Sequence, residues 1–141
     1  MKNDPVDPRA EAARIVKQFG HAVVCLPDSQ GRHLAYTVGL SDRPGRGHEL
    51  ALTGQLSQTA GIVLNGTIDE LILDGLVPSE DLVLTILSRL PVRFRRVDTS
   101  RFEVTHRSGR RPAVWQVLLP DANGSYPGDP SYQVAFIQPL L

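Results

Sequence analysis

The chain has 141 residues, of which 41% are hydrophobic and 21% are charged, and its formal net charge at pH 7 is zero. These values are typical of one soluble globular domain and exclude a chain that is disordered throughout. No apolar run approaches the roughly 20 residues of a membrane-spanning helix, and MKNDPVDPRAEAA lacks the apolar core of a signal peptide. We therefore expect a cytoplasmic domain over residues 1–141, with residues 1–7 as a flexible lead.

The first third of the chain predicts one helix followed by three strands. RAEAARIVKQF has apolar residues at helical spacing after the capping pair Asp7-Pro8, and Gly20 ends the pattern. HAVVCLP (21–27) and HLAYTVGL (33–40) flank the turn-forming DSQGR, which predicts a hairpin. After the loop SDRPGRG, HELALTG (48–54) predicts a third strand.

The rest of the chain predicts a second helix and further strands. Apolar residues at spacings of three and four predict a helix over residues 58–73, with Ser57 as its N-cap and Gly75 after its end. Residues 79–90 fit a helix, from a capping serine and first-turn acids, or a buried strand, from LVLTI, and we favour the helix. Strands are predicted for VRFRRV (92–97) and AVWQVLL (113–119), and a turn-rich loop for PDANGSYPGDP (120–130).

Together these elements predict an α+β domain, in which two or three helices pack on a largely antiparallel sheet. Residue types that build metal or cofactor sites are sparse in it. Cys25 is the only cysteine and lies in an apolar run, which excludes an intrachain disulfide and a multi-cysteine metal site. The four histidines have no His-x-x-x-His spacing, and the chain contains neither a P-loop nor a G-x-G-x-x-G run. We expect no metal and no cofactor.

Alternation along the second and third strands predicts a sheet with one bulky and one shallow face. Tyr36 and its neighbours at 34, 38 and 40 are large, whereas Ala35, Thr37 and Gly39 are small. Residues 48–54 repeat the pattern, with Thr53 among the small residues. A helix could cover the shallow face closely, through Ala60-Gly61, or the face could be a pocket floor with Thr37 and Thr53 as polar contacts.

The loop between these strands carries candidate chemistry. Arg43 and Arg46 flank a Pro-Gly pair and could bind a phosphate or carboxylate. His48 could act as an acid or base, oriented by Asp42 or Asp121, or it could bond to the loop backbone and hold the loop closed. Glu49 follows it, but adjacent strand residues point to opposite faces, so the pair makes no two-ligand metal site. Asp121 in PDANG is most simply a turn residue.

Charge is spread unevenly along the chain. Residues 89–111 hold eight arginines against Asp98 and Glu103, a net charge of +6, so the remainder of the chain carries −6. The acidic residues 69, 70, 74, 80 and 81 have no basic residue between them. Such asymmetry is typical of two faces that neutralise each other within a fold or across a dimer, or of an anion or nucleic-acid surface. In the nucleic-acid alternative, Phe94 or Trp115 would stack on bases.

Four stretches of the sequence together resemble a bacterial family known as a domain of unknown function, DUF4262. They are GHAVVCLPDSQGRHLAYTVGL, GHELALTGQLSQTAGIVLN, PVRFRRV and VWQVLLPDANGSYP with a terminal QPLL, so the resemblance runs from about residue 11 onward. The family usually has His-Pro-Glu-Leu where this chain has His48-Glu49-Leu50, and Pro-Trp where it has Pro127-Gly128. The resemblance implies a single-domain architecture and no established activity.

We therefore expect a ligand- or partner-binding module that self-associates as a homodimer. Its candidate binding residues are Tyr36, Thr37, Arg43, Arg46, His48, Glu49, Thr53 and Asp121. The alternatives are a small-molecule enzyme that uses His48 as acid or base, supported by Tyr36, Thr37 or Asp121, and a nucleic-acid-binding protein that uses the arginines of residues 89–111.

Overall fold

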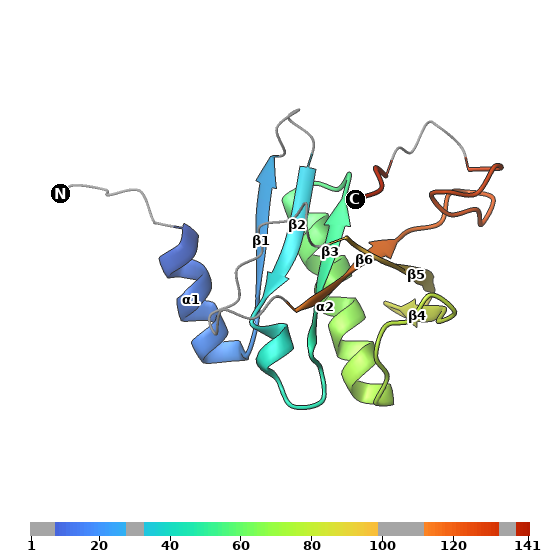
Figure 1. Ribbon diagram of the computed structural model, residues 1–141. Coiled ribbons are helices and arrows are strands. Elements are labelled where there is room, and N and C mark those ends of the chain that lie inside the picture. Colours follow the sequence, from blue (N-terminus) through green and yellow to red (C-terminus); the bar gives the residue numbers. More distant parts are fainter. Residues whose placement is uncertain (1–7, 28–32, 99–111, 133–137) are drawn as a thin grey trace.

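The computed structural model describes residues 8–27, 33–98, 112–132 and 138–141 (Figure 1). The predictions for the lead 1–7, the turn 28–32 and the arginines after residue 98 lie outside these ranges. The elements, in chain order, are α1 (Pro8–Phe19), β1 (Ala22–Pro27), β2 (His33–Val38), the 3-10 turn η1 (Leu40–Asp42), β3 (His48–Thr53), α2 (Ser57–Asp74), β4 (Leu84–Ile86), β5 (Leu90–Arg96) and β6 (Ala113–Leu118).

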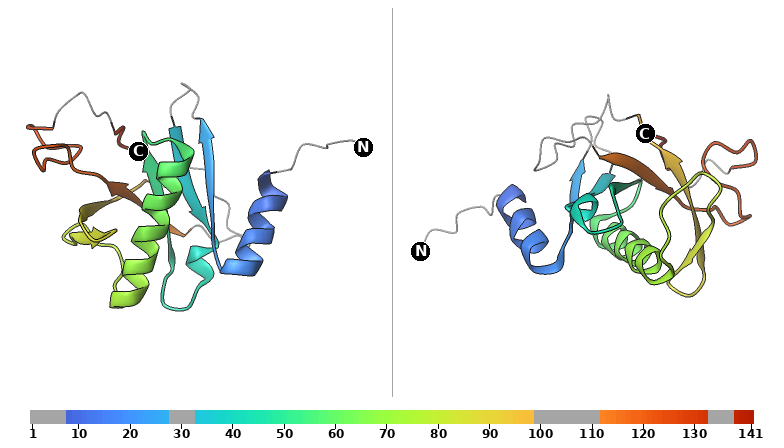
Figure 2. Two further views of the ribbon diagram at one scale, coloured as in Figure 1. Left: turned by 180° about the vertical axis from the view of Figure 1, so that it is seen from behind. Right: turned by 60° about the horizontal axis from the view of Figure 1, so that its bottom comes forward.

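The strands form one six-stranded sheet in the order β1-β2-β3-β6-β5-β4. Every neighbouring pair is antiparallel except β3 and β6, which run parallel at the centre of the sheet. Helix α2 lies across one face of the sheet, and α1 stands beside β1 at the edge (Figures 1 and 2). This arrangement confirms the predicted α+β fold. No helix among the described residues is long and apolar enough to cross a membrane.

The helix predicted for residues 79–90 is wrong, because this stretch forms β4 and the turn into β5. Leu84 and Ile86 are buried while Thr85 between them is exposed, a period of two that fits a strand and not a helix. Leu84 pairs with Val92, and Ile86 with Leu90. The capping serine and acids that favoured a helix lie instead in the irregular connection that follows α2.

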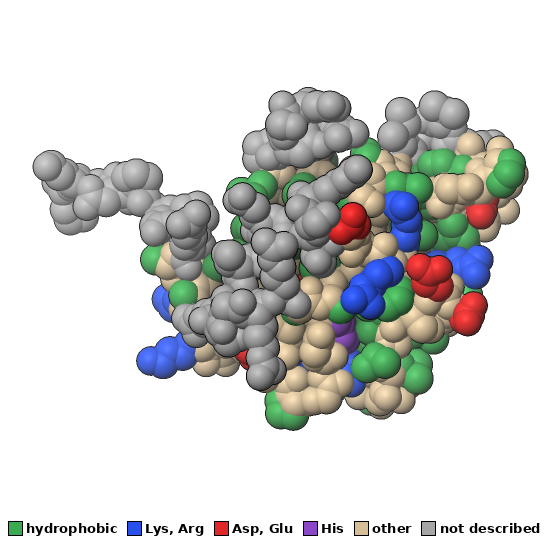
Figure 3. Space-filling view, viewed as in Figure 1, with side chains coloured by type: hydrophobic (Ala, Val, Ile, Leu, Met, Phe, Trp, Pro, Cys, Tyr) green, Lys and Arg blue, Asp and Glu red, His purple; other side chains and the backbone are tan. Residues whose placement is uncertain are grey.

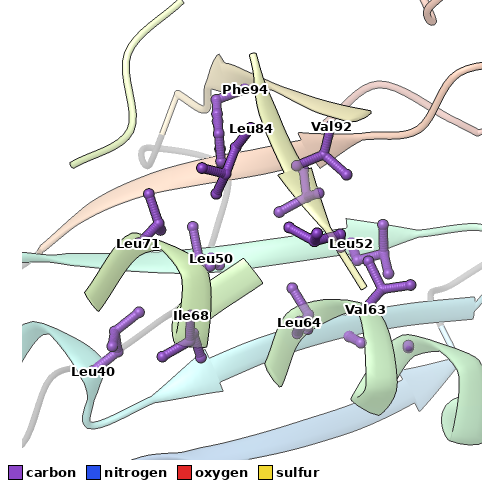
Figure 4. Packing of buried hydrophobic residues seen from close by; sticks show 14 residues of the cluster. Leu40, Leu50, Leu52, Val63, Leu64, Ile68, Leu71, Leu84, Val92 and Phe94 are labelled. Atoms are coloured by element: carbon purple, nitrogen blue, oxygen red, sulfur yellow. The ribbon is translucent and has the colours of Figure 1, made fainter. Parts of the chain in front are cut away.

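The predicted division into a bulky and a shallow sheet face is also wrong. The register of β2 against β3 places large and small side chains next to each other on each face. Ala35 pairs with Leu52, and Tyr36 pairs with Ala51, so each small residue lies beside a large one on the same face. The face toward α2 forms the main hydrophobic core (Figure 4), in which β3, α2, β4 and β5 contribute Leu50, Leu52, Leu64, Ile68, Leu71, Ile86 and Val92.

The sequence predicted Gly39 within a strand. In the structure it follows the end of β2 and caps the start of η1. Its φ of 88° lies in the left-handed region, where a residue with a side chain is strained. A Cβ atom at this position would lie 2.7 Å from Cγ1 of Val16. The close helix contact that this glycine permits is therefore made by α1, whereas at Gly61 of α2 a Cβ atom would meet nothing within 4 Å.

The sheet face opposite α2 carries a second, smaller apolar cluster and the last residues of the chain. Ala51, Val97 and Val114 are buried there, and Tyr36 and Leu141 pack against them. Residues 138–141, which we call the C-terminal segment, end near the carboxyl end of β3 (Figure 1). This segment is fixed by hydrogen bonds to the sheet, described below.

Candidate functional site

Glu49 is the centre of a buried polar cluster where β2 passes into η1. Its side chain is 1% exposed. One carboxylate oxygen accepts hydrogen bonds from the Thr37 hydroxyl (2.8 Å) and the Leu40 N–H (3.1 Å), and the other accepts from the Ser41 N–H (2.9 Å). The Thr37 oxygen also accepts from the Leu50 N–H at 2.8 Å. A buried carboxylate requires several donors, so these bonds fix the start of the loop rather than leave Glu49 for a ligand.

His48 is 3% exposed and holds the other end of the same loop. Its Nδ1 lies 2.8 Å from the Arg46 carbonyl oxygen, which can only accept, so Nδ1 carries the proton. Its Nε2 is buried and has no hydrogen-bond partner among the residues that the structure describes. Burial lowers the pKa of His48 below its ordinary value, against the opposing effect of the bond to the Arg46 carbonyl. These contacts match the alternative in which His48 bonds to the loop backbone and holds the loop closed.

Both arginines of the loop bond within the protein. Arg43 Nη1 donates to Nδ1 of His21 at 3.1 Å, and Nε2 of His21 lies 2.9 Å from the Asn65 oxygen on α2. Arg46 Nη1 donates to the Leu76 carbonyl at 2.6 Å. The loop is thereby linked to α2 through His21, and to the second residue after the end of α2 through Arg46, so Nη1 of each arginine bonds within the protein.

The two threonines predicted to share a pocket floor lie apart. Thr53 pairs with Leu34 at one end of the β2–β3 pair, and its hydroxyl donates to the Pro139 carbonyl at 2.6 Å. Thr37 lies near the other end and bonds to Glu49. Tyr36 is partly buried on the face that carries the C-terminal segment. The structure therefore does not assemble the predicted pocket floor.

Asp121 lies at the opposite end of the sheet from the 41–48 loop, because β6 starts beside His48 and Asp121 follows its far end. Its Oδ1 accepts from the N–H groups of Asn123 and Ser125, both at 2.9 Å, as expected of a turn residue. Asp121 therefore does not orient His48. Within the described ranges, no three His, Cys, Asp or Glu side chains lie close enough together to hold a metal ion.

A surface that the sequence predictions did not include lies on the outer side of α2. Ile62 is 52% exposed and Leu73 is 77% exposed, and both lie on the helix ridge that contains Gly66. Leu87, which is 47% exposed, lies against this ridge, because a Cβ atom at Gly66 would come within 2.9 Å of its Cδ2. We call Ile62, Leu73 and Leu87, with the exposed Asp69 between them, the α2 outer surface. No other described helix or strand covers it (Figure 2).

The exposed acids of this region form no ion pair with a described residue, since the one ion pair between described residues is Arg14–Glu11 on α1. They are Asp69, Asp74, Glu80 and Asp81. The β5 arginines contact groups of their own subunit. Arg93 and Arg96 lie over the Tyr126 and Trp115 rings, at 5.5 and 5.6 Å, and Arg95 Nη1 donates to the Leu141 carbonyl at 3.0 Å. Basic side chains, with some acidic ones between them, lie over the β5–β6 half of the sheet face in Figure 3.

A family model described as a domain of unknown function, DUF4262, matches residues 15–133. The chain belongs to the DUF4262 family. This result confirms the resemblance read from the sequence. No curated protein and no solved structure matches the chain.

The α2 outer surface of this DUF4262 domain had a signal in the sequence. SQTAGIVLNGTIDELILD is apolar on more than one side of the helix, with Ile62 and Leu73 outside the stripe that packs on the sheet. A helix that is apolar all round is normally covered on all sides. The C-terminal segment had no such signal, because a short Pro-containing stretch predicts neither helix nor strand.

Proposed function

We propose that this DUF4262 domain is a partner-binding module that self-associates through the α2 outer surface. The observation that supports the proposal is the exposure of Ile62, Leu73 and Leu87 together on one surface. Exposed apolar side chains gathered on one side of a surface helix are typical of protein–protein contacts. The turn at Leu87 adds to this, because Leu87 and Ser88 have φ values of 52° and 70°. Residues other than glycine adopt this conformation at a cost, and such strain is concentrated at functional surfaces.

The charges around this surface favour a contact with the arginine side of a second copy. Between Leu56 and Ser88 the chain has five acidic residues and no basic one. A two-fold contact of this surface with itself would place Asp69 near the Asp69 of its partner, which is unfavourable. Arg93 and Arg95 lie on the other side of the sheet, where Arg95 meets the C-terminal segment. The first product is therefore a head-to-tail dimer, to which further copies can add.

The enzyme alternative has less support. A general base must reach a substrate proton, and Nε2 of His48 is enclosed by protein. The nucleic-acid alternative also has less support among the described residues. Phe94 is buried in the core, and Arg96 of the same chain lies over the Trp115 ring.

The experiment is a measurement of molar mass by light scattering after gel filtration, over a range of protein concentrations and at low and high salt. We expect dimers and larger species that decrease as salt rises, because exposed ion pairs are screened. Leu73→Asp should shift the protein to monomer. The matched control is Phe19→Asp, which changes a side chain of similar exposure, 62%, on α1 and should leave the mass unchanged.

The proposal is wrong if the protein is monomeric at all concentrations, or if Leu73→Asp and Phe19→Asp behave alike. A dimer whose population does not change with salt would exclude the arginine side as the partner surface.

A further inference from the structure

We propose that the sheet face under residues 138–141 is a peptide-binding groove, filled here by the chain's own C-terminal segment, and that it also binds this segment of a second copy. The proposal deepens the proposed self-association, because it gives a second and chemically different contact between copies. It rests on the hydrogen bonds to the main chain of the segment and on the apolar cluster beside them.

Gln116 and Thr53 recognise the main chain of the segment. The Pro139 carbonyl accepts from the Thr53 hydroxyl at 2.6 Å and from Gln116 Nε2 at 2.7 Å. The Gln116 Oε1 accepts from the Leu141 N–H at 3.0 Å. The Gln116 side chain thus bonds to the carbonyl of Pro139 and to the N–H of Leu141, two residues later. These bonds come from side chains of the central strands on the sheet face, unlike strand addition, in which a peptide pairs with the main chain of an edge strand.

Arg95 and Gln138 complete the polar contacts at the two ends of the segment. Arg95 Nη1 donates to the Leu141 carbonyl at 3.0 Å. The Gln138 side chain donates to the Val117 carbonyl and accepts from the Leu119 N–H at 2.8 Å. Gln138 therefore bonds to main-chain groups at the end of β6.

The side chain of Leu141 supplies the apolar part of the contact. It packs against the small cluster of Ala51, Val97 and Val114, with Tyr36 at the side. Leu140, by contrast, is 42% exposed. The groove therefore selects an extended Gln-Pro-x-aliphatic sequence, in which the residue marked x points away.

The occupant that these contacts fit is the C-terminal segment of another copy, because they are made to this sequence. Gln116 is fully buried and Thr53 is 4% exposed. If the segment leaves, Gln116 Nε2 keeps its 3.0 Å bond to the Thr53 oxygen but loses the Pro139 carbonyl, and Gln116 Oε1 loses the Leu141 N–H. These groups are then free to bond to an identical segment. The C-terminal segment carries this chemistry, and every copy of the chain has it.

A tethered segment competes for its own groove at an effective concentration on the order of millimolar. The unmodified protein should therefore bind an added segment weakly, and variants that loosen the tethered segment should bind it more tightly. A segment that is an inseparable part of the fold predicts that loosening it disrupts the sheet face, so that the variants gain no affinity for the peptide. The two possibilities predict different affinities of the loosened variants for the peptide, and both can be tested in the full-length chain.

The experiment measures fluorescence anisotropy of a labelled peptide with the sequence VAFIQPLL of residues 134–141, titrated with full-length protein. Gln138→Ala and Leu141→Ser loosen the tethered segment in different places, and both should bind the peptide at least tenfold more tightly than the unmodified protein. Adding Gln116→Leu to either variant should abolish that gain. A peptide with aspartate in place of its last leucine is the control and should not bind. Circular dichroism confirms that each variant is folded.

A second titration uses a whole copy in place of the peptide. All proteins in it carry Leu73→Asp, which removes the contact through the α2 outer surface. Labelled Leu73→Asp protein should bind to the Gln138→Ala form, with an affinity that does not change with salt. If folded Gln138→Ala and Leu141→Ser gain no affinity for the peptide, the groove is not a peptide site. If the peptide binds and the whole copy does not, a second copy is not its occupant. Neither result depends on the light-scattering experiment above.

Discussion

The Thr37 hydroxyl donates to the Glu49 carboxylate at 2.8 Å while its oxygen accepts the N–H of Leu50, the residue that follows Glu49. The regular pairing of β2 with β3 runs from Leu34–Thr53 to Tyr36–Ala51. Just beyond it, the Thr37 side chain bonds to a main-chain group of β3. Glu49 in turn binds the first N–H groups of η1. These bonds join the end of β2 to the loop that His48 closes.

Glu49→Gln should destabilise the protein by about 2–3 kcal/mol. The amide replaces one carboxylate oxygen by an NH₂ group, which cannot accept, so one of the donors from Thr37, Leu40 or Ser41 loses its acceptor in a buried site. Urea unfolding measures the change. Glu11→Gln is the control, because Glu11 is exposed and forms one surface ion pair, and its effect should stay within about 0.5 kcal/mol. Equal effects of the two substitutions would contradict the role given to Glu49.

The unfolding free energy should decrease as pH falls below the ordinary histidine pKa of 6.5, because the pKa of His48 is lowered in the folded protein. Between the two pKa values the unfolded chain binds a proton that the folded chain does not, so acid favours unfolding there. Above pH 6.5 this contribution to stability is fully present.

His48→Asn provides the control for this pH dependence, because asparagine can still donate to the Arg46 carbonyl but does not titrate. Urea midpoints between pH 5 and 8 should therefore vary less for this variant than for the unmodified protein. Identical pH profiles would show that His48 is not the group responsible.

Gly39→Ala should destabilise the protein by about 2–5 kcal/mol, from backbone strain and overpacking together. The added Cβ meets Val16 at 2.7 Å in a backbone with a φ of 88°. Gly45→Ala separates the two causes, because Gly45 has a φ of 77° and its Cβ would meet nothing within 4 Å. It should cost about 1–2 kcal/mol. Adding Val16→Ala to Gly39→Ala should restore the part of the stability that is lost to the steric contact. If it restores none, contact with Val16 is not a cause of the destabilisation.

Ser88→Gly should stabilise the protein by about 1 kcal/mol, because glycine adopts a positive φ without strain. Ser88 has a φ of 70°, and the turn is closed by the bond from the Arg89 N–H to the Ile86 carbonyl. Thermal unfolding should show a higher midpoint for this variant. The same substitution at Ser57, in the first turn of α2, is the comparison and should not raise the midpoint. A lower midpoint for Ser88→Gly would contradict backbone strain at Ser88.

Sequence patterns predicted elements with strong local signals and failed where two patterns overlapped. The period of α1 and its end at Gly20 are local features, and Gly20 does close the helix with a 2.8 Å bond to Val16. LVLTI fits both a helix and a strand pattern. In the structure it contributes a strand, because it pairs with β5. The register of β2 against β3 depends on contacts between strands. Alternation within each strand therefore did not predict which residues share a face.

The sequence predicted the loop between the second and third strands, but not the bonding partners of its residues. Glu49 was treated as a possible ligand contact, although a carboxylate inside the apolar stretch HELALT already indicates buried donors nearby. The position of Asp121 at the far end of the sheet follows from the parallel pairing of β3 with β6. No pattern within either strand indicates that pairing, because it joins residues 48–51 to residues 113–116.

This central pairing also bears on how the chain folds. Strand β3 obtains its second neighbour from β6, more than 60 residues later in the chain. During synthesis, β1, β2 and β3 are complete long before β6. One edge of β3 therefore has no strand partner until the last quarter of the chain has been made. Pairings between distant residues form slowly because the intervening chain must first be closed into a loop. We therefore expect slow refolding limited by the docking of β6, and an exposed β3 edge on incomplete chains.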